Sequence, residues 1–214
     1  MQISDNMNLA LKLGSGLLWT LTYILIIIKG HRDKTYGMPL LALCLNLSWE
    51  FIFAFLFPHK PPQNIINMIW FSFDLIIAYQ FIRYAKIKML IPSFRRNAGF
   101  KASVCAIICF VILYDVTTQL PDLGGYYSAF TQNLLMSILF CFMIWHRKNL
   151  EGQSLYIAIF KMLGTILPSI LFYSRYPENF YLNTMYLSIL FFDGLYIYQI
   201  LRQLKKEKYK ESSI

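Results

Sequence analysis

Residues 43–57 read LCLNLSWEFIFAFLF, and a single glutamate, Glu50, interrupts this otherwise apolar run. The run belongs to one of seven apolar segments of about 20 residues, a helical length that spans a bilayer core about 30 Å thick. We predict a membrane-spanning helix for each segment: 9–28, 38–57, 65–85, 102–119, 126–146, 155–174 and 181–201. The sequence therefore predicts an all-α polytopic membrane protein, a bundle of seven transmembrane helices.

The composition agrees with this fold class. Hydrophobic residues make up 57% of the chain and charged residues 14%, against about 25% charged residues in a soluble domain. The links between the segments are too short to form domains. We expect a single domain over residues 1–214 that ends in a short basic cytoplasmic tail, 202–214.

The basic residues predict the orientation in the membrane. Of the 20 Lys and Arg residues, 16 follow the first, third, fifth and last segments, whereas the opposite side has only Lys12, Lys60 and Arg175. By the positive-inside rule, the N-terminus lies outside or in a lumen and the C-terminus is cytoplasmic. The net charge of +9 is thus explained by topology and contact with membrane lipids, and nucleic acid is not an expected partner.

Ionisable side chains inside the spans are the first candidates for function, because each costs about 2.5–3.5 kcal/mol to insert. At about 1.5 Å per residue, Glu50, Asp74 and Asp193 fall near the middle of the bilayer. Asp115 lies near the outer end of its helix, and Lys161 is close enough to the inner end to snorkel, so we expect a snorkelling or structural role for it. Three acids at one depth on three helices predict a shared interior cavity.

Such a cavity suits proton-initiated chemistry. Clustered carboxyl groups in an apolar site cannot all ionise, so at least one keeps a proton that it can donate. Aromatic rings stabilise a passing cation, and exclusion of water protects it. These properties fit the cyclisation of a polyprenyl chain. The alternative for each acid is a structural role in which a hydrogen-bonded carboxyl group joins neighbouring helices.

Two motifs resemble a known family. The stretch TYGMPLLALCLNLSWEFIFAFLFP (35–58) resembles the integral-membrane terpene cyclases of the paxilline and pyripyropene pathways. The stretch FFDGLYIYQ (191–199) resembles their last-helix Asp-Gly motif. The stretch SLYIAIFKMLGT (154–165) is similar to a helix that often carries a cation before Leu-Gly. The resemblance implies seven helices without a soluble domain.

The resemblance also implies an activity. Members of that family cyclise lipophilic, prenylated, meroterpenoid-like substrates, usually after separate prenyltransfer and epoxidation steps, in isomerase- or lyase-type reactions. It implies Glu50 and Asp193 as the catalytic acids. It implies neither a metal nor a cofactor, because protonation of an epoxide or alkene starts the reaction, and the chain contains no HExxH or CxxC motif. We expect the substrate pocket to include Asn46, Trp49, Trp70, Asp74 and Tyr196.

Two other functions fit a seven-helix chain of this size. A small transporter of sugar-like or proton-coupled solutes would have this orientation, but the chain shows no convincing internal repeat. A seven-helix receptor or retinal protein is the other alternative, but residues 181–201 contain no lysine for a retinal Schiff base, and the extramembrane loops are sparse. For the cyclase, we expect an integral protein of the cell membrane if bacterial, or of the endoplasmic reticulum if fungal.

Overall fold

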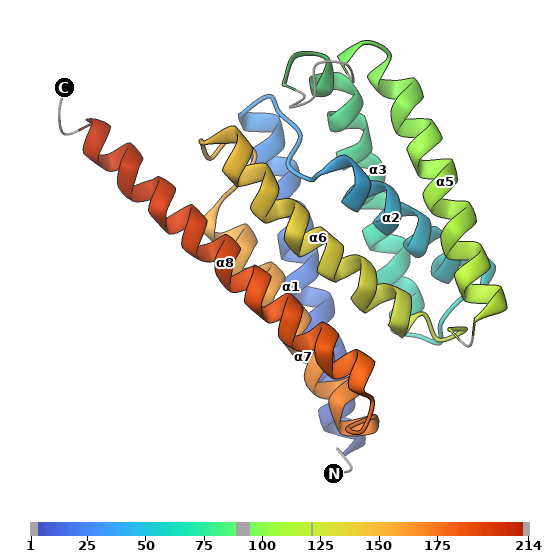
Figure 1. Cartoon of the computed structure of the whole chain (residues 1–214). Helices are drawn as coiled ribbons and strands as arrows, with labels where there is room; N and C mark the ends of the chain where they lie inside the picture. Colours follow the sequence, from blue (N-terminus) through green and yellow to red (C-terminus); the bar gives the residue numbers. More distant parts are fainter. Residues whose placement is uncertain (1–3, 89–94, 121, 212–214) are drawn as a thin grey trace.

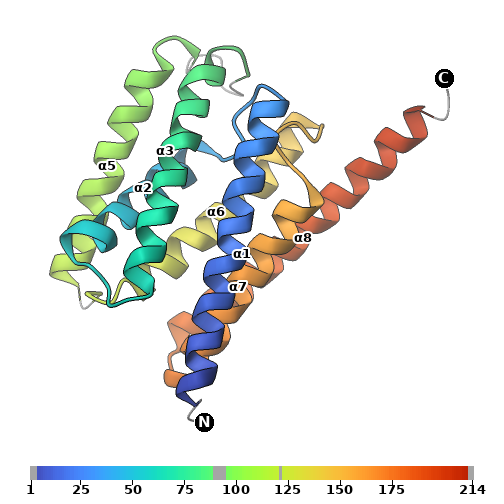
Figure 2. The same ribbon diagram turned by 180° about the vertical axis from the view of Figure 1, so that it is seen from behind.

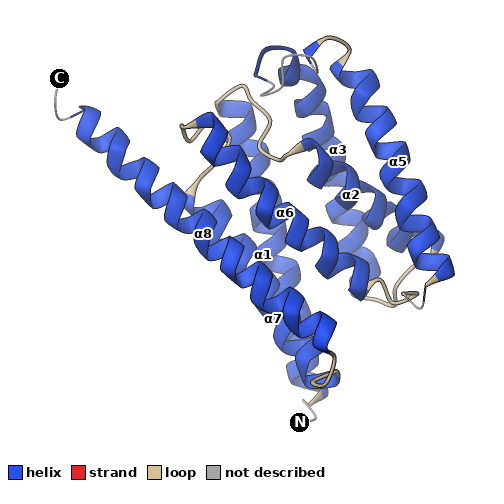
Figure 3. Ribbon diagram, in the orientation of Figure 1, coloured by secondary structure: helices blue, strands red, loops and turns tan. Residues whose placement is uncertain are grey.

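The computed structural model describes residues 4–88, 95–120 and 122–211, and every regular element in these ranges is a helix (Figure 3). The elements are α1 (Asp5–Arg32), α2 (Leu40–Phe51), the π-helix η1 (Ile52–Leu56), α3 (Gln63–Lys88), α5 (Ala98–Gln119), α6 (Tyr126–Arg147), α7 (Leu155–Arg175) and α8 (Phe180–Glu211). Six of these helices are long and apolar enough to cross a membrane. A polytopic helical membrane protein is therefore confirmed.

The second predicted span differs from the other six. In place of a full-length helix over 38–57, the chain forms α2 and then the five-residue π-helix η1, a shorter apolar unit at Leu40–Leu56. The last helix is longer than the predicted span 181–201, because α8 continues through the basic tail to Glu211; residues 212–214 lie outside the described residues. The number of complete crossings stays a prediction.

The helices run alternately up and down, with α6 near the centre (Figure 1). Helix α1 packs against α3 and α7, α6 packs against α8, and α2 lies among α3, α5 and α6. The view from the opposite side shows α1 and α7 side by side (Figure 2). In their most apolar windows, half of α6 is buried but only 11% of α5. Helix α5 therefore lines the outside of the bundle, where lipid would contact it.

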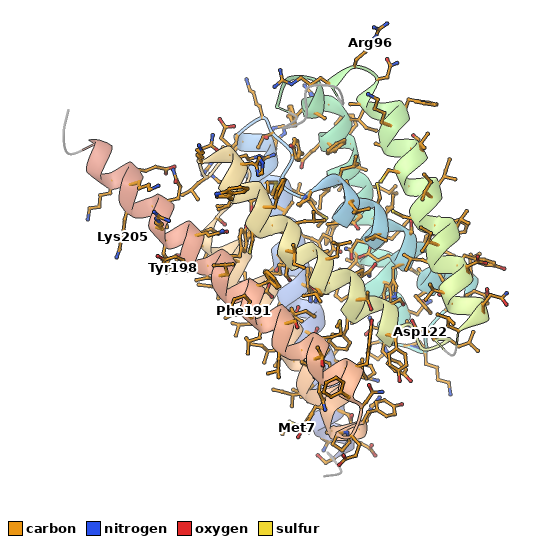
Figure 4. All side chains as sticks on the ribbon, in the orientation of Figure 1. Met7, Arg96, Asp122, Phe191, Tyr198 and Lys205 are labelled. Carbon is orange, nitrogen blue, oxygen red and sulfur yellow. The ribbon has the colours of Figure 1, made fainter. Side chains whose placement is uncertain are left out.

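The basic links gather at one end of the bundle. The links after α1 and α6, and the start of α5, lie at the end opposite the N-terminus (Figure 1). Among the labelled side chains, Arg96 and Lys205 lie toward that end, whereas Met7 and Asp122 lie toward the other (Figure 4). The geometry is compatible with the predicted orientation, and the side of the membrane that each end faces stays a prediction.

The π-helix directly follows Glu50 and changes the hydrogen bonding there. Its wider turn leaves carbonyl groups that need donors from elsewhere. Asn67 donates to the Phe53 carbonyl at 3.2 Å, and Asn64 donates to the Ala54 carbonyl at 3.0 Å. These bonds attach the start of α3 to the end of η1 and hold the segment after Glu50 in place.

Gly125 joins the same region to α6. Its φ of +68° is one that side chains disfavour, and a Cβ atom there would lie 2.6 Å from the Phe53 ring. The Trp49 indole N–H donates to the Gly125 carbonyl and to the Ser128 hydroxyl, both at 3.1 Å. Close contact between α2 and the start of α6 thus fixes the Trp49 ring one residue before Glu50.

Candidate active site

A cavity of about 450 Å³ lies within the bundle. Helices α1, α2, α3, α6 and α7 contribute to its wall, which is rich in aromatic rings, among them Trp19, Trp49, Trp70, Tyr126, Phe130 and Phe172. Trp70 is oriented by a 3.1 Å hydrogen bond from its indole N–H to the Thr20 hydroxyl. The wall therefore offers apolar surface and π-faces to whatever occupies the cavity.

Glu50 forms part of this wall although its side chain is almost completely buried. The Tyr23 hydroxyl donates to Glu50 Oε1 at 2.6 Å, and Asn46 Nδ2 lies 3.3 Å from the same oxygen. Asn46 also donates to the Tyr23 hydroxyl. Glu50 Oε2 has no hydrogen-bond partner among the described residues. One carboxyl oxygen is thus anchored by Tyr23, and the carboxyl group also lies within side-chain hydrogen-bonding reach of Asp74.

Asp74 on α3 lies next to this group. Asn46 Nδ2 is 3.2 Å from Asp74 Oδ2, so one amide bridges the two acids. Asp74 is fully buried, and the cavity wall does not include it. The predicted proximity of Glu50 and Asp74 is therefore confirmed, whereas Asp74 is not the cavity-lining residue that we expected.

Asp193 belongs to a second polar group, formed by α6, α7 and α8. Lys161 Nζ lies 2.6 Å from Asp193 Oδ1 and 2.6 Å from the Ser137 hydroxyl, and neither charged side chain is more than 1% exposed. Of the two roles considered for Lys161, snorkelling to the membrane surface is excluded by its burial, and the ion pair fits the structural role. The ion pair and the hydroxyl supply inside the bundle the partners that the ammonium would otherwise find in water.

The structure does not bring Glu50 and Asp193 together in one cavity, which corrects the predicted arrangement. Asp193 instead lines a separate groove of about 250 Å³ between α7 and α8, with Thr165 and Tyr186. The link between the two groups is indirect. Lys161 Nζ is 3.4 Å from Asn133 Oδ1 and 5.8 Å from the centre of the Trp19 ring, and both of these side chains line the main cavity.

The remaining pocket predictions divide between the cavity and its surroundings. Asn46, Trp49 and Trp70 line the cavity, as expected. Tyr196 does not: it is fully buried against Phe140, and its hydroxyl donates to the Gln153 side chain. Tyr196 shares a helix face with Asp193, but it lies almost one turn closer to the link between α6 and α7, where Gln153 is.

Sequence reasoning missed the contribution of α1. Tyr23 is the closest partner of Glu50, and Trp19 lies one turn before it on the same face of the helix. The first segment contains no internal acid, so a prediction based on buried acids does not include it. Two large aromatic residues four apart, each with a polar atom, were the signal that could have identified this face.

Comparison with known proteins identifies the family of the chain. Residues 3–201 match the family of Pyr4-like transmembrane terpene cyclases. The Pyr4-family terpene cyclase mfmH of Annulohypoxylon moriforme is 28% identical over 202 residues, 90% of this chain and 80% of the relative. Terpene cyclase macJ of Penicillium terrestre is 30% identical over 176 residues, 78% of this chain and 67% of macJ. Terpene cyclase pyr4 of Aspergillus fumigatus is 25% identical over 175 residues, 78% of this chain and 72% of pyr4. Since the match to the family covers nearly the whole sequence, the chain belongs to the Pyr4-like transmembrane terpene cyclases.

Proposed function

We propose that the protein cyclises a prenylated, meroterpenoid-like substrate within the membrane, and that Glu50 starts the reaction by donating a proton. The observation that supports this most is the position of Glu50, a buried acid in the wall of an aromatic cavity, within side-chain hydrogen-bonding reach of a second buried acid, Asp74. Two carboxyl groups bridged by one amide repel each other when both are charged. The arrangement favours a proton retained on the pair until a substrate accepts it.

The reaction then proceeds as an isomerisation. Glu50 transfers its proton to an epoxide oxygen or a terminal alkene carbon, and it becomes a carboxylate. In the epoxide case the C–O bond breaks while the nearest double bond attacks the carbon. Further double bonds attack in turn, and the last cation loses a proton, so that the product has the same formula as the substrate. The reaction starts from a proton and requires no metal ion in this scheme.

The surrounding residues have distinct roles in this scheme. Tyr23 orients Glu50 through its 2.6 Å hydrogen bond and stabilises the carboxylate left after proton transfer. Trp19, Trp49 and Trp70 present π-faces to the migrating positive charge. Asp193 acts at a distance, because its ion pair keeps Lys161 beside Asn133 and Trp19 in the wall. The substrate has to be supplied by prenyltransfer and, for the epoxide case, by epoxidation.

Co-expression tests this function. Cells that make a prenylated aromatic precursor, with and without its terminal epoxide, would also express the wild-type protein, Glu50→Gln, Asp193→Asn or Asp115→Asn. Mass spectrometry should detect a cyclised isomer with the wild type and with Asp115→Asn, whose carboxyl group is exposed. Both acid variants should lose it while they still insert in the membrane. Unchanged product from Glu50→Gln and Asp193→Asn would contradict the proposal.

A further inference from the structure

Three cations surround the mouth of the main cavity. Lys12 from α1, Lys60 from the link between η1 and α3, and Arg175 at the end of α7 all line it. Lys60 and Arg175 are exposed, so the cavity reaches the surface at this end of the bundle. These are the only three lysines or arginines that the chain places on the N-terminal side of the membrane in the predicted topology. Their convergence on one opening is not required by the fold.

None of these three cations forms an ion pair with a described residue. Within the described ranges, Glu50 is the only acidic residue in the cavity wall. Arg175 donates to the neutral side-chain oxygen of Asn8 at 2.9 Å. The nearby Asp122 is buried and accepts from the backbone N–H groups of Tyr127 and Ser128, at the start of α6. The three cations therefore line the mouth without an ion pair, and the acids Asp5 and Glu178 at the same end of the bundle are exposed and are not part of the cavity wall.

The cations and Glu50 are far apart along the cavity. Lys12 precedes Tyr23, the partner of Glu50, by 11 residues on α1, which corresponds to about 16 Å of helix rise. Between them the wall consists largely of aromatic and apolar side chains, including Trp19, Phe130 and Leu171. A ligand that satisfies the whole cavity would have an anionic group at one end and a long apolar chain reaching the acid.

We infer that the mouth is a binding site for the anionic head group, a carboxylate, enolate or phosphate, of an amphiphile whose apolar chain extends into the cavity. The inference rests on the proposed function for one point, that the buried end of the chain is the reacting end. Binding of the head group at the mouth fixes the register of the chain against Glu50 and so determines which double bond or epoxide receives the proton. A substrate and a membrane phospholipid can both offer this chemistry.

Farnesoic acid and its methyl ester test the site, because they share one isoprenoid chain and differ in head-group charge. Binding to the purified protein in a neutral detergent at about pH 8, where a carboxylic acid is ionised, can be followed by tryptophan fluorescence. Three of the four tryptophans line the cavity, and Trp145 is exposed elsewhere. We expect the acid to bind about tenfold more tightly than the ester, and the preference to weaken as salt is added.

Variants at the mouth separate charge from packing. Lys12→Met combined with Arg175→Met should reduce the preference for the acid to about twofold or less and leave ester binding unchanged. Unchanged ester binding also shows that the variant is folded. Lys205→Met removes an exposed charge at the far end of α8 and should keep the full preference. Equal binding of acid and ester by the wild-type protein would overturn the inference, as would a preference that survives in the mouth variant.

A competition experiment distinguishes the two sources of the anion. Short-chain phosphatidylglycerol and phosphatidylcholine differ in the charge of the head group. Displacement of farnesoic acid by phosphatidylglycerol alone would support the anion site and identify a lipid as its occupant, whereas resistance to both lipids would support a substrate head group. Glu50→Gln should retain the preference for the acid even where cyclisation is lost, so failure of this inference and failure of the proposed function give different results.

Discussion

The ion pair between Lys161 and Asp193 predicts a strong energetic coupling between α7 and α8. Both side chains are buried, and the two charged atoms lie 2.6 Å apart. Removal of one partner leaves an unpaired charge inside the bundle, which costs about 3–5 kcal/mol, whereas removal of both leaves no charge and is often nearly neutral. Lys161→Met and Asp193→Asn should therefore each destabilise the protein more than the double variant does.

The magnitude can be worked out from these costs. A loss of about 3 kcal/mol in the free energy of unfolding lowers the Tm of a chain of this size by roughly 6–12 °C. The double variant should regain most of this loss, with a coupling energy of about 2 kcal/mol or more. Asp115→Asn, which neutralises an exposed carboxyl group, should change Tm little.

Thermal unfolding in detergent with a thiol-reactive fluorophore suits the measurement. The chain has four free cysteines, of which Cys44, Cys109 and Cys141 are buried and become reactive on unfolding. Cys141 lies close to the pair, with its thiol 3.2 Å from the Phe192 carbonyl. If the loss in the double variant equals the sum of the two single losses, or if either single variant is as stable as the wild type, the reasoning about the pair is refuted.

Three further perturbations test the site and its surroundings. Tyr23→Phe removes the hydroxyl that donates to Glu50 and should lower kcat about 10–100-fold with little change in Tm. An unchanged kcat would show that the 2.6 Å hydrogen bond has no role in catalysis. Gly164→Ala would place a Cβ atom 2.8 Å from Trp19 Cδ1. We therefore expect the Trp19 ring to shift and chromatography to show an altered product profile. An identical profile and rate would mean that the ring does not shape the cavity. Burial lowers the pKa of His59, because the folded protein favours the neutral imidazole. The free energy of unfolding should therefore keep the His59 contribution above the unfolded pKa of about 6.5 and lose it as pH falls toward the lower folded pKa. Tm measured from neutral to acidic pH should fall less steeply in His59→Gln, and parallel curves would contradict this.

The fold could be predicted in large part from hydropathy, because each helix satisfies its own backbone and only its length and apolar character have to match the membrane. The same reasoning failed at α2. Hydropathy treats the run through Phe57 as one helix, whereas η1 widens the turn after Glu50. That change depends on side-chain donors from α3, Asn64 and Asn67, and no pattern within the second segment reveals them.

The site shows the same division between local and long-range information. A lone acid in an apolar run identified Glu50 as buried, because the cost of burial is a property of the segment. Which side chain meets it depends on how the helices rotate against one another, so neither Tyr23 nor the separation from Asp193 could be predicted. Lys161 is the clearest case: its distance from the helix end favours snorkelling, but its partner is on another helix.

The proton donor is the central claim, and the rate of a single turnover by purified Glu50→Gln tests it most directly. The precursor identified by co-expression would be mixed with excess enzyme, and tryptophan fluorescence would confirm that the variant binds it. Loss of a general acid should slow product formation by about 10²–10⁴-fold with binding intact, whereas Glu50→Asp, which keeps the carboxyl group, should retain part of the rate. A Glu50→Gln rate within a few-fold of the wild type would contradict the account.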